Sequence, residues 1–554
     1  MFLNPLLRHW LVLPTLCAIS CGTARSQMNS TPHVTIDSGS ISGSHFGLKA
    51  QEVMFLGIPY AAPPTGDRRW KPPDPVEGWK GIRKADAFAP ACPQPLDSVR
   101  ETVEQAREFS QTLPYFKDFR TDEDCLYINI WTTNLGNKQR APVMVFLHGG
   151  AGVGGNSWIP PLGPALARRG VVFASVEFRV GVLGNLAHPA LTAESAHHAS
   201  GNYGTLDQIA ALHWIQQNVA AFGGDPGNVT IFGQSDGGNK VCVLMASPLA
   251  RGLFHRAIME SGQCNDILSP ELKKPIRYEG SLAPGTAEDT GLQLARDLKI
   301  PEGPNALAQL RGKTPDELIQ ASHGLDMYTN STVDGWVLPE QAAAIFRDGR
   351  QAKVPVIVGS ADDEMATLYN PPDDPTTLAS YKTWLKQNSF FANTEDIFRL
   401  YPASTDAEVP ATFMRLGTDV AAAGAYSLAQ QTAHAGQNAY LYYFTYPSKG
   451  KMAGHGGIHG AELKFLSGVF RKSYWGEMDD EDRKLIETVS GYWTRFAATG
   501  DPNGLGAPHW PAYETKTDLC LEIGHVVKSR PVAHKDKYEV IQESLRERLA
   551  KLQP

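Results

Sequence analysis

Short apolar runs alternate with longer segments of helical periodicity from residue 33 onward. The runs are Val143–Leu147, Val171–Val176, Val229–Phe232, Pro355–Val358 and Tyr440–Tyr446. Runs without polar alternation are typical of strands buried on both faces, and intervening helices place such strands in a mostly parallel sheet. The chain is therefore expected to be an α/β protein whose working residues lie at the carboxyl ends of its strands.

The apolar fraction supports one large core. Hydrophobic residues make up 42% of the 554 positions, and α/β enzymes of this length often form a single unit. We expect one domain over residues 33–535, followed by a helical tail over 536–554. Residues 266–332 and 366–436 are rich in Pro, Gly and charge, and are interpreted as helical and looped insertions that roof the site.

The N-terminus has the pattern of a targeting segment. Arg8 precedes a short apolar run, Trp10 to Ile19, and small residues follow it. That run is too short to span a bilayer, so residues 1–27 are predicted to be a signal peptide of a secreted or periplasmic protein. Ala18–Cys21 also resembles a lipoprotein cleavage box, with Cys21 as the lipid acceptor. No later stretch is long and apolar enough for a membrane helix.

Charge and cysteine content exclude several classes of protein. The formal net charge of −7 comes without any basic block of the kind that follows a phosphate backbone, so nucleic-acid binding is not expected. No C-x-x-C or Cys/His cluster has zinc-site spacing, so no metal is expected. Beyond the signal region the cysteines are Cys92, Cys125, Cys242, Cys264 and Cys520. An odd number leaves one thiol unpaired within the chain, and spacing alone does not fix the pairing.

The segment Gly233–Gly237 fits the pattern G-x-S-x-G around Ser235. It directly follows the predicted strand Val229–Phe232 and precedes a helical run, Gly237 to Met245. A strand–turn–helix of this kind holds its central residue in a strained conformation and exposes the hydroxyl beside a helix N-terminus. Ser235 is therefore the candidate nucleophile. The alternative is a glycine-rich turn with an ordinary surface serine.

A second glycine-rich turn, His148–Gly152, follows the strand Val143–Leu147. The negative oxygen of a tetrahedral intermediate needs fixed donors, and small residues let backbone N–H groups point at one spot. Gly150 and Ala151 are the candidate donors, with the N–H of Asp236 as the third. The alternative is a flexible glycine loop.

A serine nucleophile needs a base, and the base needs a carboxylate that fixes its tautomer. In α/β enzymes with a G-x-S-x-G turn between a strand and a helix, the three residues follow in the chain order serine, acid, histidine. Asp362, Asp363 and Glu364 lie together after the strand Pro355–Val358, and composition does not choose among them. Of His455 and His459, the second is favoured because it directly precedes an apolar run.

Further motifs extend over most of the chain. They are Phe55–Ala61, Glu123–Trp131, Asn202–Gln208, Phe222–Pro226 and Trp510–Pro511. Together with the two turns, these motifs resemble the type-B carboxylesterase and cholinesterase family from about residue 33 to about residue 530. The resemblance implies an α/β-hydrolase fold, a central mostly parallel sheet flanked by helices.

The resemblance also implies roles for individual residues. It implies Glu364 as the acid, His459 as the base, Ser261 as a support of the triad, and a disulfide between Cys92 and Cys125. It places the oxyanion donors at Gly150, Ala151 and Asp236.

Four positions depart from the family pattern. Gln234 stands where glutamate is usual, and Asp236 where alanine is usual. Ala151 replaces a glycine, and Gly152 replaces an aromatic residue. A buried, unpaired carboxylate beside a forming oxyanion would be costly, so the side chain of Asp236 is expected to point away or to be neutralised. Gly152 is expected to leave a roomier pocket.

These observations predict a serine carboxylic-ester hydrolase that acts on a small-molecule ester through an acyl-enzyme, without metal or organic cofactor. One alternative is a hydrolase of amides, thioesters or a large plant or toxin ester, since the same triad serves all of these. The other is a non-catalytic binding protein on the same fold. Such proteins typically lack triad residues, whereas Ser235, Glu364 and His459 are all present.

Overall fold

The computed structural model describes residues 31–109, 118–158, 161–265, 268–274, 285–325, 331–371, 373–387, 391–469 and 471–552. The predicted signal peptide and Cys21 lie outside these residues. Within the described residues, none of the helices combines the length and apolar character needed to cross a membrane.

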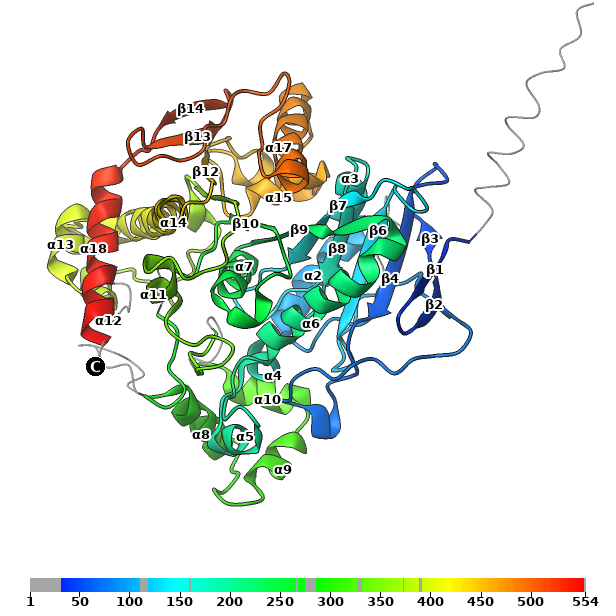
Figure 1. Ribbon diagram of the computed structural model, residues 1–554. Coiled ribbons are helices and arrows are strands. Elements are labelled where there is room, and N and C mark those ends of the chain that lie inside the picture. Colours follow the sequence, from blue (N-terminus) through cyan, green and yellow to red (C-terminus); the bar gives the residue numbers. More distant parts are fainter. Residues whose placement is uncertain are drawn as a thin grey trace, which may run out of the picture.

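A twisted sheet runs through the molecule (Figure 1). Its strands, in spatial order, are β14 (Lys528–Pro531), β13 (Leu519–Ile523), β12 (Ala439–Phe444), β11 (Val356–Ala361), β10 (Arg256–Glu260), β9 (Gly224–Gln234), β7 (Ala141–Leu147), β8 (Val172–Val176), β6 (Tyr127–Thr132), β4 (Val53–Pro59) and β3 (Ser44–His45). The strands from β13 to β8 are parallel to their neighbours, and antiparallel pairs flank them at both edges. The expectation of a mostly parallel sheet is confirmed.

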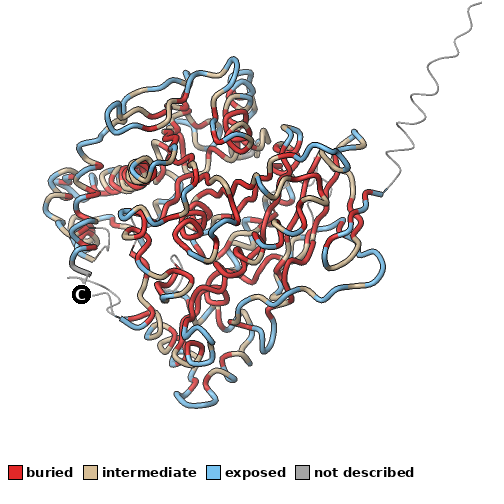
Figure 2. The backbone as a smooth tube through the Cα atoms, in the orientation of Figure 1, coloured by how far each residue is buried: buried red, intermediate tan, exposed pale blue. Residues whose placement is uncertain are grey.

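Both faces of the central strands are buried (Figure 2). Val143, Val145 and Leu147 of β7 belong to one apolar cluster, whereas Met144 and Phe146 belong to another on the opposite face. Successive side chains of a strand point to opposite faces. An uninterrupted apolar run therefore marks a strand covered on both sides, which is why these strands are recognisable in the sequence.

Helices cover the two faces (Figure 1). The first cluster contains side chains of α6 (Tyr203–Asn218), α7 (Asp236–Ala246) and α14 (Val409–His434). The second contains side chains of α3 (Leu162–Ala167), α15 (Ala461–Ser467) and α17 (Asp480–Thr499). The remaining α-helices are α2 (Leu96–Phe109), α4 (Gly181–Asn185), α5 (Pro189–Glu194), α8 (Ala287–Asp297), α9 (Ala306–Arg311), α10 (Pro315–Ser322), α11 (Ala342–Arg347), α12 (Leu378–Gln387), α13 (Thr394–Leu400), α16 (Lys472–Trp475) and α18 (Lys535–Leu552).

The two segments interpreted as insertions differ from each other. Residues 266–332 contain short helices, and two of them, α8 and α10, begin with capping boxes that satisfy their first N–H groups. Residues 366–436 include α14, a helix of 26 residues that packs on β11 and β12. The C-terminal helix α18 in turn packs on α14, where Gln542 donates a hydrogen bond to the carbonyl of Ala423 at 3.2 Å.

A second, smaller sheet is formed by strands from the first part of the described chain. It contains β1 (His33–Ile36), β2 (Gly39–Ser42) and β5 (Ile82–Lys84), in that order. It lies at the edge of the molecule beside β3 and β4 (Figure 1).

Candidate active site

Ser235 lies at the sharp turn between β9 and α7. Its φ of +60° and ψ of −130° fall in a region that costs a residue with a Cβ about 1–3 kcal/mol. Neighbouring backbone is tightly packed, because a Cβ on Gly237 would lie 2.1 Å from the carbonyl oxygen of Leu147, and one on Gly262 would lie 1.8 Å from that of Ser235. The N–H of Ser235 donates to the carbonyl of Glu260 at 2.8 Å. Glycine packing and this bond hold the half-buried serine in its strained conformation.

The turn after β7 lies directly against this serine. A Cβ on Gly149 would be 3.1 Å from Cβ of Ser235 and 3.6 Å from the N of Asp236. Gly150 and Ala151 follow with φ of +120° and +53°, and both are exposed. The three residues expected to donate to an oxyanion therefore come from two adjacent turns. The N–H of Asp236 is the first of α7.

His459 and Glu364 are in contact. Nδ1 of His459 lies 2.5 Å from Oε2 of Glu364, whose side chain is 2% exposed. The other carboxylate oxygen of Glu364 accepts the N–H of Ala361 at 2.7 Å. Burial lowers the pKa of His459, but the negative charges of Glu364 and Glu462 outweigh it, and the pKa is raised overall. The imidazolium is thus stabilised by a fixed carboxylate.

The neighbouring acids have other partners. Asp363 contacts Nδ1 of His455 at 2.7 Å in a more exposed pair. Asp362 accepts the N–H of Gly457 at 2.6 Å, and burial raises its pKa to about 6. Of the three acids after β11, only Glu364 contacts His459, and of the two histidines, only His459 contacts Glu364. These pairings agree with the choices implied by the resemblance.

Nε2 of His459 faces Gln234, the neighbour of Ser235, at 3.1 Å. In the amide orientation that satisfies both polar atoms, Oε1 of Gln234 also accepts the N–H groups of Gly460 and Ser235, each at 3.3 Å. Among the described residues, the hydrogen bond at Nε2 goes to this amide and not to the Ser235 hydroxyl. Hydrogen bonds between catalytic groups are often long or poorly aligned before substrate binds, so this contact does not exclude a later pairing of His459 with Ser235.

Two buried glutamates lie close to each other near the pair of His459 and Glu364: Glu462, whose charge acts on His459, and Glu260, which interacts with Glu462. Oε1 of Glu462 accepts the hydroxyls of Ser261 at 3.1 Å and Tyr442 at 2.9 Å. Burial, followed by the charge of Glu364, raises the pKa of Glu462 to about 7. Glu260 accepts the indole N–H of Trp493 at 2.5 Å, and burial raises its pKa well above the ordinary value.

Sequence reasoning found Ser261 but missed both of these glutamates. The available signal was a charged residue within an apolar run, three positions after His459 for Glu462 and next to Ser261 for Glu260.

The side chain of Asp236 is neutralised by Lys240. Oδ2 of Asp236 lies 3.4 Å from Nζ of Lys240, and each residue is 5% exposed. Burial raises the pKa of Asp236, whereas the charge of Lys240 lowers it. Of the two arrangements expected for this carboxylate, the structure has the neutralised one, and the sequence analysis did not identify its partner.

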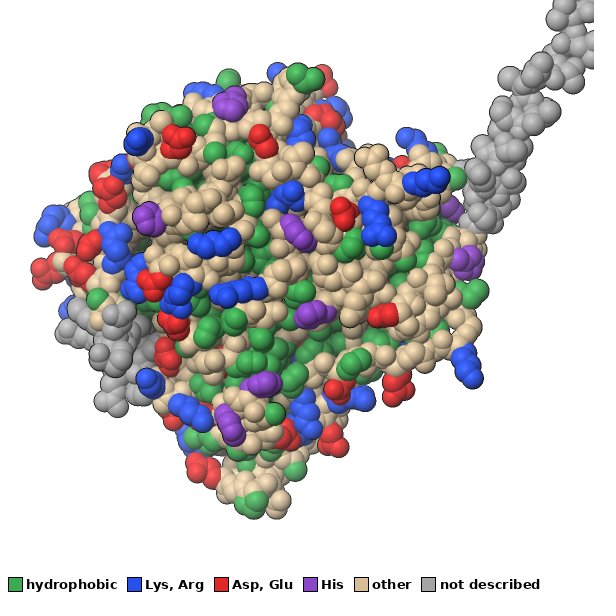
Figure 3. Space-filling view, viewed as in Figure 1, with side chains coloured by type: hydrophobic (Ala, Val, Ile, Leu, Met, Phe, Trp, Pro, Cys, Tyr) green, Lys and Arg blue, Asp and Glu red, His purple; other side chains and the backbone are tan. Residues whose placement is uncertain are grey.

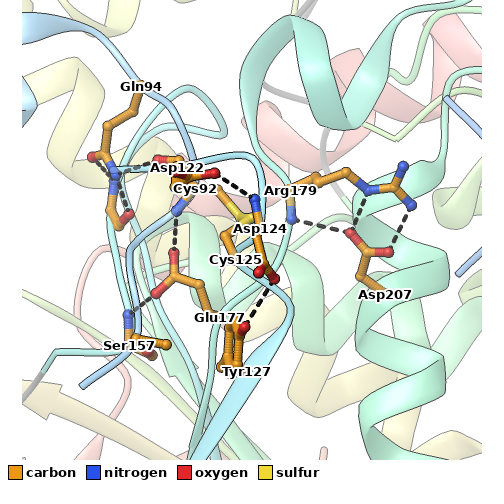
Figure 4. Close-up of a disulfide and its surroundings, with 12 residues drawn as sticks. Cys92, Gln94, Asp122, Asp124, Cys125, Tyr127, Ser157, Glu177, Arg179 and Asp207 are labelled. Atoms are coloured by element: carbon orange, nitrogen blue, oxygen red, sulfur yellow. Dashed lines mark hydrogen bonds and ion pairs between the residues drawn. A yellow bond between two sulfur atoms is a disulfide. The ribbon is translucent and has the colours of Figure 1, made fainter. Parts of the chain in front are cut away.

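The structure pairs four of the cysteines. Cys92 and Cys125 form the disulfide implied by the resemblance, and a second joins Cys242 to Cys264. Cys520 is free and buried. The first disulfide lies beside Glu177, which accepts N–H groups of Cys92 and Ser157 (Figure 4). Since β8 ends just before Glu177, this disulfide links the loop that contains Cys92 to the carboxyl end of β8. The candidate site lies at that end of the sheet.

One face of the molecule carries charged side chains of both signs (Figure 3). Acidic and basic side chains are interspersed over this face. No group of three or more His, Cys, Asp or Glu side chains in the described part of the chain is arranged to hold a metal ion.

Comparison with known proteins places these features in a known group. The sequence profile of the carboxylesterase family matches residues 30–541. Fumonisin B1 esterase of Sphingopyxis macrogoltabida is 34% identical, over 86% of this chain and 84% of that protein. Liver carboxylesterase 1 of Oryctolagus cuniculus is 32% identical, over 93% and 94%. A solved PNB esterase structure, 28% identical, superimposes with a TM-score of 0.77 over 92% of this chain and 99% of that one.

Proposed function

The chain belongs to the carboxylesterase family and is a carboxylic-ester hydrolase, and from this premise we propose that Ser235, His459 and Glu364 form its catalytic triad. The observation that supports the triad most strongly is the 2.5 Å contact between Glu364 and His459, formed next to the strained Ser235 turn. A carboxylate that fixes one ring nitrogen leaves the other to act as a base.

The proposed reaction has two acyl-transfer steps. In the first, Nε2 of His459 takes the hydroxyl proton of Ser235 as Oγ bonds to the ester carbonyl carbon. The tetrahedral intermediate collapses, the alcohol leaves with the proton from His459, and an acyl-enzyme remains. In the second, water gives its proton to His459 and attacks the acyl carbon. The carboxylic acid then leaves and Ser235 regains its proton.

In this mechanism the negative carbonyl oxygen meets the N–H groups of Gly150, Ala151 and Asp236. The two turns that carry these donors already lie against each other, because a Cβ on Gly149 would be 3.1 Å from Cβ of Ser235 and 3.6 Å from the N of Asp236. The ring of His459 exchanges the Gln234 amide for the Ser235 hydroxyl, a short movement because Gln234 and Ser235 are adjacent in the chain.

The substrate class follows from the turn after β7. Gly150, Ala151 and Gly152 present almost no side chain toward the nucleophile, so this wall does not select small acyl groups. A relative named fumonisin B1 esterase supports an ester of the kind in that name as the second candidate substrate. Amides and thioesters remain alternatives for the same triad.

We also propose that the protein is exported. Disulfides persist mainly in oxidising compartments, and the described chain contains two. Removal of residues 1–27 would release a single domain that begins near residue 33, whereas lipidation at Cys21 would anchor that domain to a membrane.

The test is a panel of 4-nitrophenyl esters together with matched amides and thioesters. Wild type is expected to hydrolyse the esters and to bind a fluorophosphonate covalently, and Ser235→Ala is expected to abolish both. Ser529→Ala, at the far edge of the sheet on β14, is the matched control and is expected to retain both. Absence of labelling in wild type would indicate a binding protein instead.

A further inference from the structure

A buried ion pair occupies the first turn of α7. Asp236 and Lys240 are one helical turn apart, with Oδ2 and Nζ at 3.4 Å, and each residue is 5% exposed. Exposed pairs with this spacing contribute little, because water screens them. A buried pair differs, because removing one partner leaves an uncompensated charge in a medium that solvates it poorly.

The carboxylate of this pair belongs to the same residue whose N–H we assign to the oxyanion hole. Its Oδ1 has no hydrogen-bond partner among the described residues, so Lys240 carries most of the compensation. The side chain of Asn239 and, after it, the backbone of Gly152 in the neighbouring turn also lower the pKa of Asp236. The charge state of this carboxylate therefore acts directly on the space where negative charge develops in the reaction.

The other ionisable groups near the pair do not replace Lys240. Burial lowers the pKa of His148, at the end of β7, to about 4, with a contribution from Lys240, so His148 is neutral at physiological pH. Glu177 lies 4.0 Å from Nε2 of His148, and burial raises its pKa to about 7. His459 lies beyond Ser235 and is held by Glu364. Among the described residues, Lys240 is the one cation at ion-pair distance from Asp236.

We propose that Lys240 is a positioning residue for ester hydrolysis, which keeps the Asp236 carboxylate compensated so that the donor N–H groups face the forming oxyanion without an opposing charge. The inference rests on the proposed function. It explains how the chain places an acidic residue directly after its nucleophile. The competing explanation is that the pair only stabilises α7.

The experiment compares wild type, Lys240→Met, Asp236→Asn and the double variant. Turnover of 4-nitrophenyl acetate is measured from pH 5 to pH 9, with thermal unfolding of each protein as a check on folding. In Lys240→Met the kcat is expected to fall by about 30-fold at pH 8, with KM changed less than about threefold, since the lost interaction acts on the transition state. The difference in kcat between wild type and Lys240→Met is expected to narrow toward pH 5, because the unpaired Asp236 takes a proton there.

The double variant retains every backbone donor and removes both charges. Its kcat at pH 8 is therefore expected to be about tenfold higher than that of Lys240→Met. Lys313→Met is the matched control, because Lys313, just before α10, forms an i,i+4 ion pair with Glu317 at 3.0 Å that is far more exposed. A pH-independent loss that is equal in the single and double variants would overturn the inference. A wild type without Ser235-dependent turnover would instead overturn the proposed function.

Discussion

Nε2 of His459 lies 3.1 Å from the side-chain amide of Gln234, while Nδ1 of the same ring lies 2.5 Å from Glu364. The imidazole is therefore held at both nitrogens, by a neutral group on one side and by a carboxylate on the other. Since the neutral group precedes the nucleophile in the chain, the residue at position 234 affects both the charge of the ring and its access to Ser235.

Replacing Gln234 by glutamate is expected to move the pH profile of activity. A carboxylate at 3.1 Å from Nε2 favours the imidazolium, so the pKa of His459, already raised, rises further. Ester hydrolysis needs the neutral ring, so activity appears at higher pH than in wild type. The measurement is kcat/KM from pH 5 to pH 9. Gln309→Glu, on the exposed surface of α9, should leave the profile in place, and an unshifted limb in Gln234→Glu would contradict the assignment.

Replacing Glu364 by glutamine is expected to lower kcat by about 10³–10⁴-fold, because an amide neither stabilises the imidazolium nor fixes the required tautomer. Asp363→Asn is a close control: it removes an adjacent carboxylate that contacts His455 instead. It should retain nearly all activity. A similar loss in the two variants would show that the acid has been misassigned.

The sheet was predictable because its strands are simple. The run Val143–Leu147 predicts β7 to within two residues, since an apolar strand buried on both faces has no other interpretation at that length. β9 begins at Gly224, earlier than predicted, because Gly224 pairs with Ala141 of β7 across an irregularity that contains the turn residues Asp225, Pro226 and Gly227, and regular pairing resumes at Val229. Tertiary contact overrides local preference there.

The site was only partly predictable. Local spacing identified Ser235, but composition left three acids open after β11, and the choice of Glu364 came from the resemblance. The distinction depends on which carboxylate meets a ring 95 positions later, which spacing does not encode. Lys240 was missed because within its own helix it resembles an ordinary surface charge, and Glu462 was missed although it lies within an apolar run; packing buries both.

The number of thiols that react with a reagent should depend on whether the protein is folded and whether its disulfides are reduced. Cys520 is buried, and burial raises the pKa of its thiol to about 11, so a colorimetric disulfide reagent is expected to find no reactive thiol in the folded protein. Unfolding without reductant should expose one thiol in a chain lacking residues 1–27, and reduction should expose five. Two further thiols before reduction would show that Cys92–Cys125 or Cys242–Cys264 is not formed.

Acyl selectivity should be broad. Because Gly150, Ala151 and Gly152 offer almost no side chain beside the nucleophile, kcat/KM for a series of 4-nitrophenyl esters is expected to vary by no more than about tenfold between short and bulky acyl groups. Each ester is compared with its background rate in Ser235→Ala. Strict selection for acetate would mean that residues elsewhere in the chain close the pocket.

Replacing Glu462 by glutamine is expected to raise the stability of the protein at pH 8 and to lower its activity. Burial raises the pKa of Glu462 from 4.5 to about 7, so the folded state binds a proton more tightly than the unfolded chain, and stability falls as pH rises through this window. The neutral amide removes this loss of stability. Glutamine still accepts the hydroxyls of Ser261 and Tyr442 through Oε1, so the variant should match wild type at pH 5 and unfold at a higher temperature at pH 8.

The same substitution should weaken catalysis. The charge of Glu462 helps to raise the pKa of His459, so its removal favours the neutral ring at rest and supports the imidazolium less in the transition state. The acid limb of kcat/KM then moves to lower pH while the plateau falls. Glu487 lies on α17 and forms an ion pair with Arg169 at the surface. Glu487→Gln therefore controls for the loss of a surface carboxylate, and it should change neither the unfolding temperature nor the pH profile of kcat/KM. A variant that is less stable than wild type at pH 8 would contradict a raised pKa of Glu462 in the folded enzyme.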